Sequence, residues 1–249
     1  MTQAACANSF TALVCSPTDA QASFSRLNFH HLGEVQPNLT AKEITAALDV
    51  VAKELQKRKQ SVTIVAVGGA INTVLLSKLG AIAFILHLRY AETRASTADV
   101  DFFGVDKRLP SGLTDAIKKA VKTVGINEGW LNNHTALFID NDRINSLFLE
   151  AVNDNIIIFK KPGLTVLAAP WRYCLVAKLD KAGKSGAKAY DIDDAAAYLH
   201  ELVKQTSGPV TKAKLQVWAK EFNVSLAEGP VSRLATTYKA KYGTAGVID

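Results

Sequence analysis

Two aspartates, Asp99 and Asp101, are the residues of this chain whose type and spacing best predict chemistry. They lie in the stretch Arg94-Ala-Ser-Thr-Ala-Asp-Val-Asp-Phe-Phe, where the apolar neighbours indicate a strand. Residues two apart in a strand point to the same face, so the two carboxylates lie side by side. Magnesium takes hard oxygen ligands and completes its shell with water and substrate phosphates. The pair therefore predicts a site for metal and nucleotide, and two solvated aspartates at a strand edge are the alternative.

A glycine turn lies upstream of this pair. Gly68 and Gly69 join a predicted buried strand, residues 61–67, to a predicted helix, residues 70–79. Glycine lets a ligand approach the backbone closely, and the helix start behind it offers free N–H groups and the positive end of the helix dipole. The spacing matches neither the P-loop nor the dinucleotide-binding fingerprint. The turn therefore predicts a phosphate cradle, and a tight packing turn is the alternative.

The order strand, Gly-Gly, helix and Arg-x-Ser-Thr-x-Asp-x-Asp resembles the nucleotidyltransferase superfamily, in particular its small members related to bacterial abortive-infection and toxin–antitoxin nucleotidyltransferases. The matching residues are Gly68, Gly69, Arg94, Thr97, Asp99 and Asp101. A fainter match covers residues 171–178 and 188–194. The resemblance implies an α/β (α+β) fold with a mixed sheet flanked by helices and a C-terminal helical region.

The activity implied by the resemblance is transfer of a nucleoside monophosphate from an NTP to a hydroxyl group. Asp99 and Asp101 would hold Mg²⁺ or Mn²⁺, and ATP is the expected nucleotide. The acceptor is a protein side chain, an RNA end or a small molecule, three alternatives that the sequence leaves open. A toxin or antitoxin partner is a further function class, and genomic neighbourhood would decide it.

The resemblance also implies further nucleotide-binding residues. Lys178 matches a lysine that the family places near the nucleotide, and Arg94 either neutralises phosphate charge or pairs with the two aspartates. Asp191 and Asp194 either line the site from the helical side or cap a helix and pair with Lys188. The sequence leaves both alternatives open.

The chain departs from the family in its glycine turn. Ala70 stands where the family usually has a serine, which removes a hydroxyl contact to phosphate. Asn72 or Thr73 would substitute for that contact.

A catalytic member also carries a third carboxylate on the next strand, where it binds metal and acts as a general base. The candidates are Asp140, at the end of a predicted strand at residues 135–140, and Glu150, in an apolar run that fits a helix or a strand. Ordinary surface acids are the alternative for both, and His134 is expected to be a structural hydrogen-bonding residue. If neither acid reaches the site, the rival hypothesis is a degenerate nucleotidyltransferase-fold module that binds nucleotide without transferring it.

The remaining elements follow from capping and periodicity. Thr40 and Glu43 form a capping box that starts a helix running to about Lys59, and Pro110 introduces an amphipathic helix that ends near Val124. Two further short strands are expected, and no strand after Pro170. The expected strands cover residues 155–159 and 164–168. The expected organisation is a tail and lead-in at residues 1–38, an α/β domain at 39–170 and a helical region at 171–249.

Length and composition predict a globular protein of the cytoplasm. The chain has 249 residues, and its hydrophobic content of 48% is enough for a core. Cys6, Cys15 and Cys174 have no metal-ligand or disulfide spacing, which favours a reducing compartment. The N-terminal segment lacks the regions of a secretory signal, and the apolar run at residues 79–88 is too short to span a bilayer. We therefore expect no membrane partner.

Charge is uneven along the chain. The net charge is +6, and residues 171–249 hold twelve Lys and Arg against eight Asp and Glu. Lys178, Lys181, Lys184 and Lys188 lie in one segment, where they would grip a triphosphate or a polynucleotide backbone. For Lys181 and Lys184 a solvated helix end is the favoured interpretation. Aromatic residues rarely interleave with basic ones, so a nucleic-acid partner is not indicated.

Overall fold

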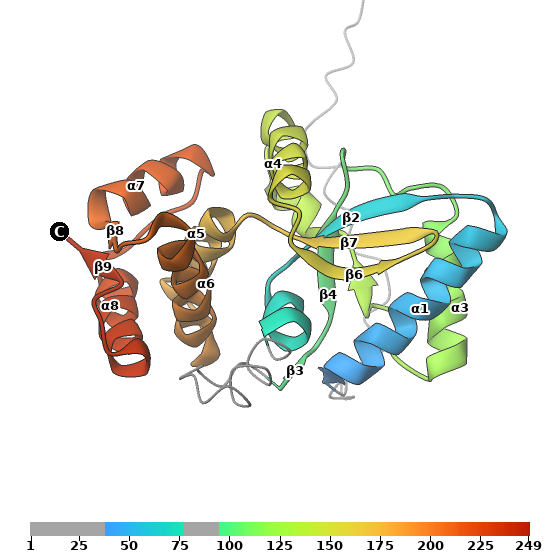
Figure 1. The fold of residues 1–249 in the computed structure, drawn as a ribbon, viewed down its shortest axis with the longest axis horizontal. Coiled ribbons are helices and arrows are strands. Elements are labelled where there is room, and N and C mark those ends of the chain that lie inside the picture. The colour runs from blue at the N-terminus through green and yellow to red at the C-terminus, as the bar shows by residue number, and fades with distance from the viewer. Residues whose placement is uncertain (1–37, 77–94) are drawn as a thin grey trace, which may run out of the picture. The chain divides into compact units, whose positions relative to one another are not determined.

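The computed structural model describes residues 38–76 and 95–249, which belong to one compact unit, Pro37–Asp249 (Figure 1). Arg94 and the apolar run at residues 79–88, both named in the sequence analysis, lie outside the described residues.

The described part of the chain before Pro170 is built on a five-stranded mixed sheet. Its strand order is β5-β4-β2-β7-β6. The central strand β2 pairs antiparallel with β4 and parallel with β7, and the outer pairs are parallel β4 with β5 and antiparallel β7 with β6. The bounds are β2 Val62–Val67, β4 Val100–Phe103, β5 Leu131–Asn132, β6 Ile157–Lys161 and β7 Leu164–Ala168. The predicted α/β architecture with a mixed sheet is thus confirmed.

The two central strands are apolar along nearly their whole length. Five of the six residues of β2 are buried, and only Thr63 is half-buried. In β7 only Thr165 is half-buried. Strands covered on both faces carry such continuous apolar runs instead of an alternating pattern. The predicted strands at residues 61–67 and 164–168 are both confirmed.

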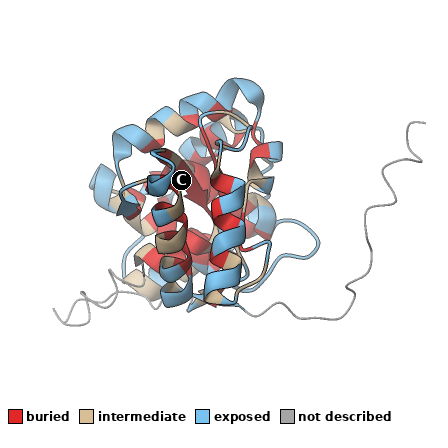
Figure 2. Cartoon of the chain, turned by 90° about the vertical axis from the view of Figure 1, so that its right-hand side faces the viewer, coloured by how far each residue is buried: buried red, intermediate tan, exposed pale blue. Residues whose placement is uncertain are grey.

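Helices α1, Ala41–Lys57, and α3, Leu113–Val124, pack side by side and bury amphipathic faces. The buried positions of α1 recur every three or four residues, the spacing of one helix face: Ile44, Ala47, Leu48, Val51, Ala52 and Leu55. Figure 2 shows buried residues on the inner faces of the helices and exposed residues on the outer faces. Thr40 caps α1, and Thr40 and Glu43 complete the predicted capping box.

The β6–β7 hairpin packs directly against α1. Gly163 in its turn has φ +94, and a Cβ there would lie 2.4 Å from the carbonyl oxygen of Ala52. No side chain fits at this position, so glycine is required both for the backbone conformation and for the close approach.

The predicted strand at residues 135–140 is wrong. A 3₁₀ helix, η2 His134–Phe138, occupies this segment, and the strand beside β4 is the shorter β5. The side-chain oxygen of Asn132 accepts a hydrogen bond from the backbone N–H of His134 at 3.0 Å, a local turn that ends β5. Leu137 and Phe138, whose apolar character suggested a strand, are 71% and 84% exposed.

The chain after Pro170 is mainly helical. Its helices are α5 Trp171–Ala182, α6 Tyr190–Thr206, α7 Lys212–Glu221 and α8 Glu228–Tyr242. Helix α5 contacts the other three and is buried on most sides, as expected of a central helix (Figure 1). The expectation of no strand here is wrong in detail, because β8 Val210–Thr211 and β9 Val247–Ile248 form a parallel pair. Two-residue strands are too short to give a periodic signal. No helix among the described residues combines the length and apolar character that crossing a membrane requires.

Candidate functional site

Strand register brings the two predicted motifs together. Asp101 of β4 lies opposite Val67, the last residue of β2, and Gly68 follows Val67 directly. Asp99 immediately precedes β4, and both aspartate side chains are half-buried. Segments separated by some thirty residues in the sequence therefore place their carboxylates and the glycine turn at one end of neighbouring strands.

The glycine turn has the backbone conformation that makes glycine necessary. Gly68 has φ +67, and a Cβ built on it would meet no atom within 4 Å. The space beside Gly68 is therefore open. Gly69 and Ala70 begin a helical segment, which continues as a π-helix, η1 Ile71–Leu76. Short π-helical segments are frequent at functional sites.

Asn72 and Thr73, the predicted substitutes for the missing serine, are both buried in η1, each about 1% exposed. Among the described residues, the amide nitrogen and the amide oxygen of Asn72 have no hydrogen-bond partner. An unsatisfied buried amide costs about 1–3 kcal/mol, so its presence calls for an explanation. A ligand contact next to the glycine turn is such an explanation.

Asn132 is the residue that joins the two aspartates to the neighbouring strand. Its amide nitrogen donates to Asp99 Oδ2 at 3.2 Å. The pKa of the Asp101 carboxyl is raised above its ordinary value, first by burial and then by the negative charge of Asp99, while the charges of His134 and Lys181 and a hydrogen bond from Asn132 act in the opposite direction. The site is thus rich in negative charge that a cation would stabilise.

Neither predicted candidate for the third carboxylate occupies the position next to Asp101. In the parallel β4–β5 pair, the residue in register with Asp101 is Asn132. Glu150 lies in α4, Asn141–Asp154, and its carboxylate binds Arg172 through two hydrogen bonds, one of 2.7 Å to Arg172 Nε. Asp140 is the exposed residue just before α4. The position where the resemblance expects a third acid therefore holds an amide.

The residues present fit a magnesium ion that is completed by a ligand. Among the described residues, no group of three or more His, Cys, Asp or Glu side chains is arranged to hold a metal ion. Asp99 and Asp101 supply hard oxygen ligands, and magnesium bound through one or two carboxylates usually takes its other ligands from water and substrate phosphates.

Lys178, Asp191 and Asp194 form a buried ionic cluster. Lys178 Nζ lies 2.9 Å from Asp191 Oδ1 and 2.8 Å from Asp194 Oδ2, and the three side chains are 9%, 0% and 3% exposed. Burial lowers the pKa of Lys178, but the charges and hydrogen bonds of the two aspartates outweigh it, so the pKa is raised. Asp191 also accepts the backbone N–H of Lys188 at 2.9 Å, which favours the capping alternative for this residue. The cluster joins α5 to the start of α6.

The C-terminal helices contact the glycine turn. The hydroxyl of Tyr198, in α6, donates to the carbonyl oxygen of Gly68 at 2.7 Å, and the Tyr198 ring stacks on Trp171 at 5.8 Å. Cys174 of α5 is buried in the same region, and burial raises its pKa to about 12. The thiol therefore stays protonated and acts as a small apolar residue.

Lys181 lies at an exposed helix end, as expected. It is exposed on the last turn of α5, and its charge lowers the pKa of both Asp101 and Asp191. The positive charge of Lys181 therefore acts on both the aspartate pair and the ionic cluster. By contrast, Lys184 pairs with Asp180 at 2.5 Å. Lys184 lies four residues after Asp180, a spacing at which opposite charges pair, whereas Lys181 has no acid three or four residues away.

Thr97 is buried in a separate two-stranded pair. It lies in β3, Ser96–Thr97, opposite Leu39 of β1, Leu39–Thr40. The structure thus brings together Gly68, Asp99, Asp101 and Asn132, and separately Lys178, Asp191 and Asp194. Asn132 was not a predicted site residue, because the strand that carries it spans only two residues.

A family model described as a domain of unknown function, DUF7582, matches residues 36–245. The chain belongs to the DUF7582 family. No curated protein and no solved structure matches it. The matched residues of this DUF7582 domain include the glycine turn, the aspartate pair and the ionic cluster, so the whole candidate site lies within the family domain.

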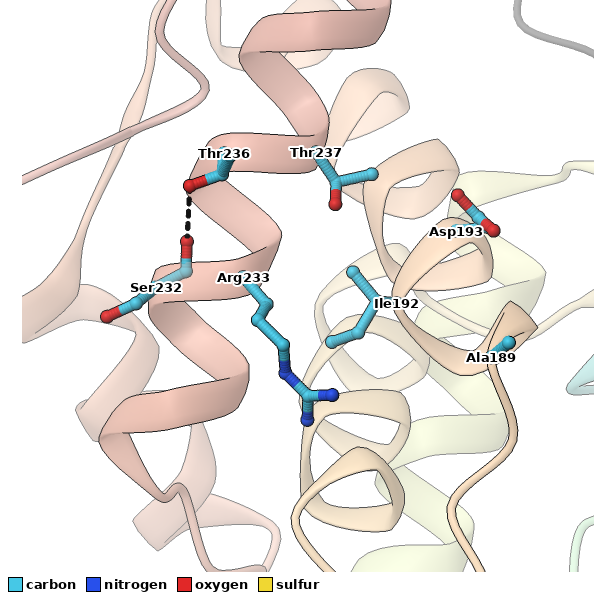
Figure 3. Close-up of a pocket in the computed structure, with 7 residues that line it drawn as sticks. All are labelled: Ala189, Ile192, Asp193, Ser232, Arg233, Thr236 and Thr237. Atoms are coloured by element: carbon cyan, nitrogen blue, oxygen red, sulfur yellow. Dashed lines mark hydrogen bonds between the residues drawn. The ribbon is translucent and has the colours of Figure 1, made fainter.

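Several hollows open on the described surface of the DUF7582 domain, and one of them lies next to the site. A cavity of about 510 Å³ opens between α3 and β5, and Asn132 is in its wall. A hollow of about 440 Å³ lies between α6 and α8, where Ile192 and Arg233 point into the space between the helices (Figure 3). The two charged side chains of the second hollow are engaged, since Arg233 donates to the Ala182 carbonyl at 2.9 Å and Asp193 pairs with Lys241.

Proposed function

We propose that this protein is a magnesium-dependent nucleotidyltransferase, which moves a nucleoside monophosphate from an NTP, with ATP as the expected donor, to a hydroxyl acceptor. The observation that carries the proposal is the register between Val67 and Asp101, because it sets the aspartate pair beside the turn at Gly68. A carboxylate pair and an open glycine turn before a helix start are complementary to a metal-bound triphosphate.

Each group in the proposed site has a role that follows from its place. Asp99 and Asp101 bind the cation, which neutralises charge on the phosphates when bound. Gly68, Gly69 and the following helix start receive the phosphates, and the unsatisfied amide of Asn72 donates to one of them. Lys181 offsets further negative charge. Attack by the acceptor oxygen forms a new bond to the α-phosphorus, the acceptor proton leaves, and pyrophosphate departs with the electrons of the broken P–O bond.

Lys178, Asp191 and Asp194 have a supporting role in this proposal. Their charges are directed at one another, so the cluster fixes α5 and α6 behind the glycine turn. The hydrogen bond from the Tyr198 hydroxyl to the Gly68 carbonyl oxygen then holds the glycine turn against α6. This arrangement makes the three residues positioning groups for the nucleotide site.

A second candidate function is a nucleotide-binding module without transferase activity. Asn132 favours it, because an amide beside Asp101 can neither act as a general base nor add negative charge to a metal site. Such a module would bind magnesium and NTP and leave the NTP intact.

The test is incubation with α-labelled NTPs, magnesium and separate pools of protein, RNA and small-molecule acceptors. The nucleotidyltransferase transfers label, and Asp99→Asn/Asp101→Asn abolishes transfer and magnesium-dependent binding. The matched control is Asp142→Asn, an exposed acid in the first turn of α4. Magnesium-dependent NTP binding without transfer would favour the module. If wild-type protein bound no NTP, both functions would be refuted.

A further inference from the structure

The cavity between α3 and β5 adjoins the aspartate pair through one shared residue. Its walls are Leu109, Thr114, Ile117, Lys118, Val121, Lys122, Glu128, Leu131, Asn132 and Asn133. Asn132 is in this wall while its amide nitrogen is bonded to Asp99 at 3.2 Å. A molecule in the cavity would therefore lie next to Asp99 and Asp101. These carboxylates are where we expect the metal ion, with the α-phosphate of the nucleotide beside it.

The volume and lining of the cavity suit a small organic molecule. About 510 Å³ lies within the usual range for small-molecule sites, and aliphatic side chains with a few polar groups are the usual lining. Of the aliphatic residues in its walls, Leu109 is 44% exposed, whereas Ile117 and Leu131 are buried. An apolar body of the ligand would cover this aliphatic surface.

The charges around the cavity favour an anion. Lys118 and Lys122 are four residues apart on α3, so they lie on one face of the helix, and both are exposed. Among the described residues, neither makes an ion pair at 4 Å or less. Glu128, also exposed, is the single acid in the wall, so positive charge exceeds negative charge there.

We infer that this cavity binds the acceptor substrate, and that the acceptor is a small organic anion with an apolar body and a hydroxyl group. This inference rests on the proposed nucleotidyl transfer. The anionic group lies at Lys118 and Lys122, the apolar body lies on the aliphatic wall, and the hydroxyl lies at the Asn132 end. In the transfer, the hydroxyl oxygen bonds to the α-phosphorus, its proton goes to solvent, and the NTP releases pyrophosphate.

The experiment uses 8-anilinonaphthalene-1-sulfonate, a fluorescent probe with an apolar body and one anionic group, titrated into the full chain. Wild-type protein should bind one equivalent, and Lys118→Ala/Lys122→Ala should weaken binding at least tenfold. The matched control is Lys119→Ala, an exposed lysine on the same helix that is not part of the cavity wall, and it should change binding less than twofold. Val121→Trp, which narrows the cavity, should remove probe binding.

A second titration, with Mg-ATP, separates this inference from the proposed function. The lysine double variant should bind Mg-ATP like wild type, and saturating Mg-ATP should leave probe binding intact, since donor and acceptor bind together. Displacement of the probe by Mg-ATP would assign the cavity to the nucleotide and overturn the acceptor role. Equal probe binding by all variants, or no saturable binding, would overturn the cavity assignment itself. Probe binding that follows the lysines in a protein that binds no Mg-ATP would instead refute nucleotidyl transfer.

Discussion

Replacing Lys178 by methionine tests whether the buried ionic cluster is structural. The substitution keeps a long side chain in a nearly closed space but leaves Asp191 and Asp194 without their cation. Removing one partner of a buried ion pair costs about 3–5 kcal/mol. Two uncompensated carboxylates place Lys178→Met near the upper end of this range. With a urea m-value of roughly 3 kcal/mol/M, the unfolding midpoint should fall by about 1.5–1.7 M.

The pH dependence of the Lys178→Met effect gives a second measurement. Lys178 and a backbone hydrogen bond from Lys188 outweigh burial and lower the pKa of Asp191 below its ordinary value of 3.8. The stability that ionised Asp191 contributes is therefore complete when the pH is above the ordinary pKa of 3.8. It is lost as the pH falls through the lowered pKa of the folded protein. The stability that charged Lys178 contributes is complete when the pH is below its ordinary pKa of 10.5. It is lost as the pH rises through the raised pKa of the folded protein. The wild-type advantage should thus be large at neutral pH and shrink in strong acid.

A triple variant provides the control for Lys178→Met. Lys178→Met/Asp191→Asn/Asp194→Asn removes the charges together, and it should recover most of the lost stability. A penalty below about 1 kcal/mol for Lys178→Met, or one that stays the same in strong acid, would refute the structural assignment. A variant of normal stability with weak ATP binding would instead assign Lys178 directly to the nucleotide.

Three further predictions concern the proposed site. Asn132→Asp should lower the thermal unfolding temperature without magnesium, since it replaces a hydrogen-bond donor to Asp99 by a like charge, and added magnesium should restore that temperature. A loss of stability that magnesium does not reverse would contradict the site geometry. Lys181→Ala should weaken Mg-ATP binding about tenfold (~1.4 kcal/mol), as measured by calorimetry. Lys184→Ala should not, because Lys184 is already paired with Asp180, and equal effects of the two variants would exclude Lys181 from the site. Gly68→Ala should cost about 1–2 kcal/mol in urea unfolding from its left-handed backbone alone, while Gly208→Ala, with no positive φ and open space, should cost little.

The sequence was most informative where a local rule decided the structure. The capping box at Thr40 depends on side chains three residues apart, and the central strands depend on long apolar runs, so both were predictable. The β5 strand was not, because its two residues gain their partners from β4, and the more apolar residues 135–140 attracted the prediction. Tertiary pairing overrides local propensity in such short segments.

The residues of the candidate site also fall into a group that could be predicted from the sequence and a group that could not. Asp99, Asp101 and Gly68 could be named because glycine turns and paired carboxylates have recognisable chemistry at short spacing. Asn132 could not, since its proximity to Asp101 comes from parallel register between strands joined by a helix. The mutual pairing of Lys178 with Asp191 and Asp194 was likewise not predictable, because it depends on how two helices pack.

The amide at Asn132 lowers the electrostatic cost of holding two aspartates side by side. A third carboxylate in register with Asp101 would raise the electrostatic cost of a site where burial and Asp99 already raise one pKa. Asn132 instead donates a hydrogen bond to Asp99, which stabilises the negative charge of the pair. In the proposed site, an amide at position 132 leaves two carboxylates among the described residues for magnesium, and we expect the remaining ligands to come from water and phosphate. For the proposed site we therefore expect magnesium binding and nucleotide binding to depend on each other, because neither the ion nor the triphosphate would have a complete set of partners without the other.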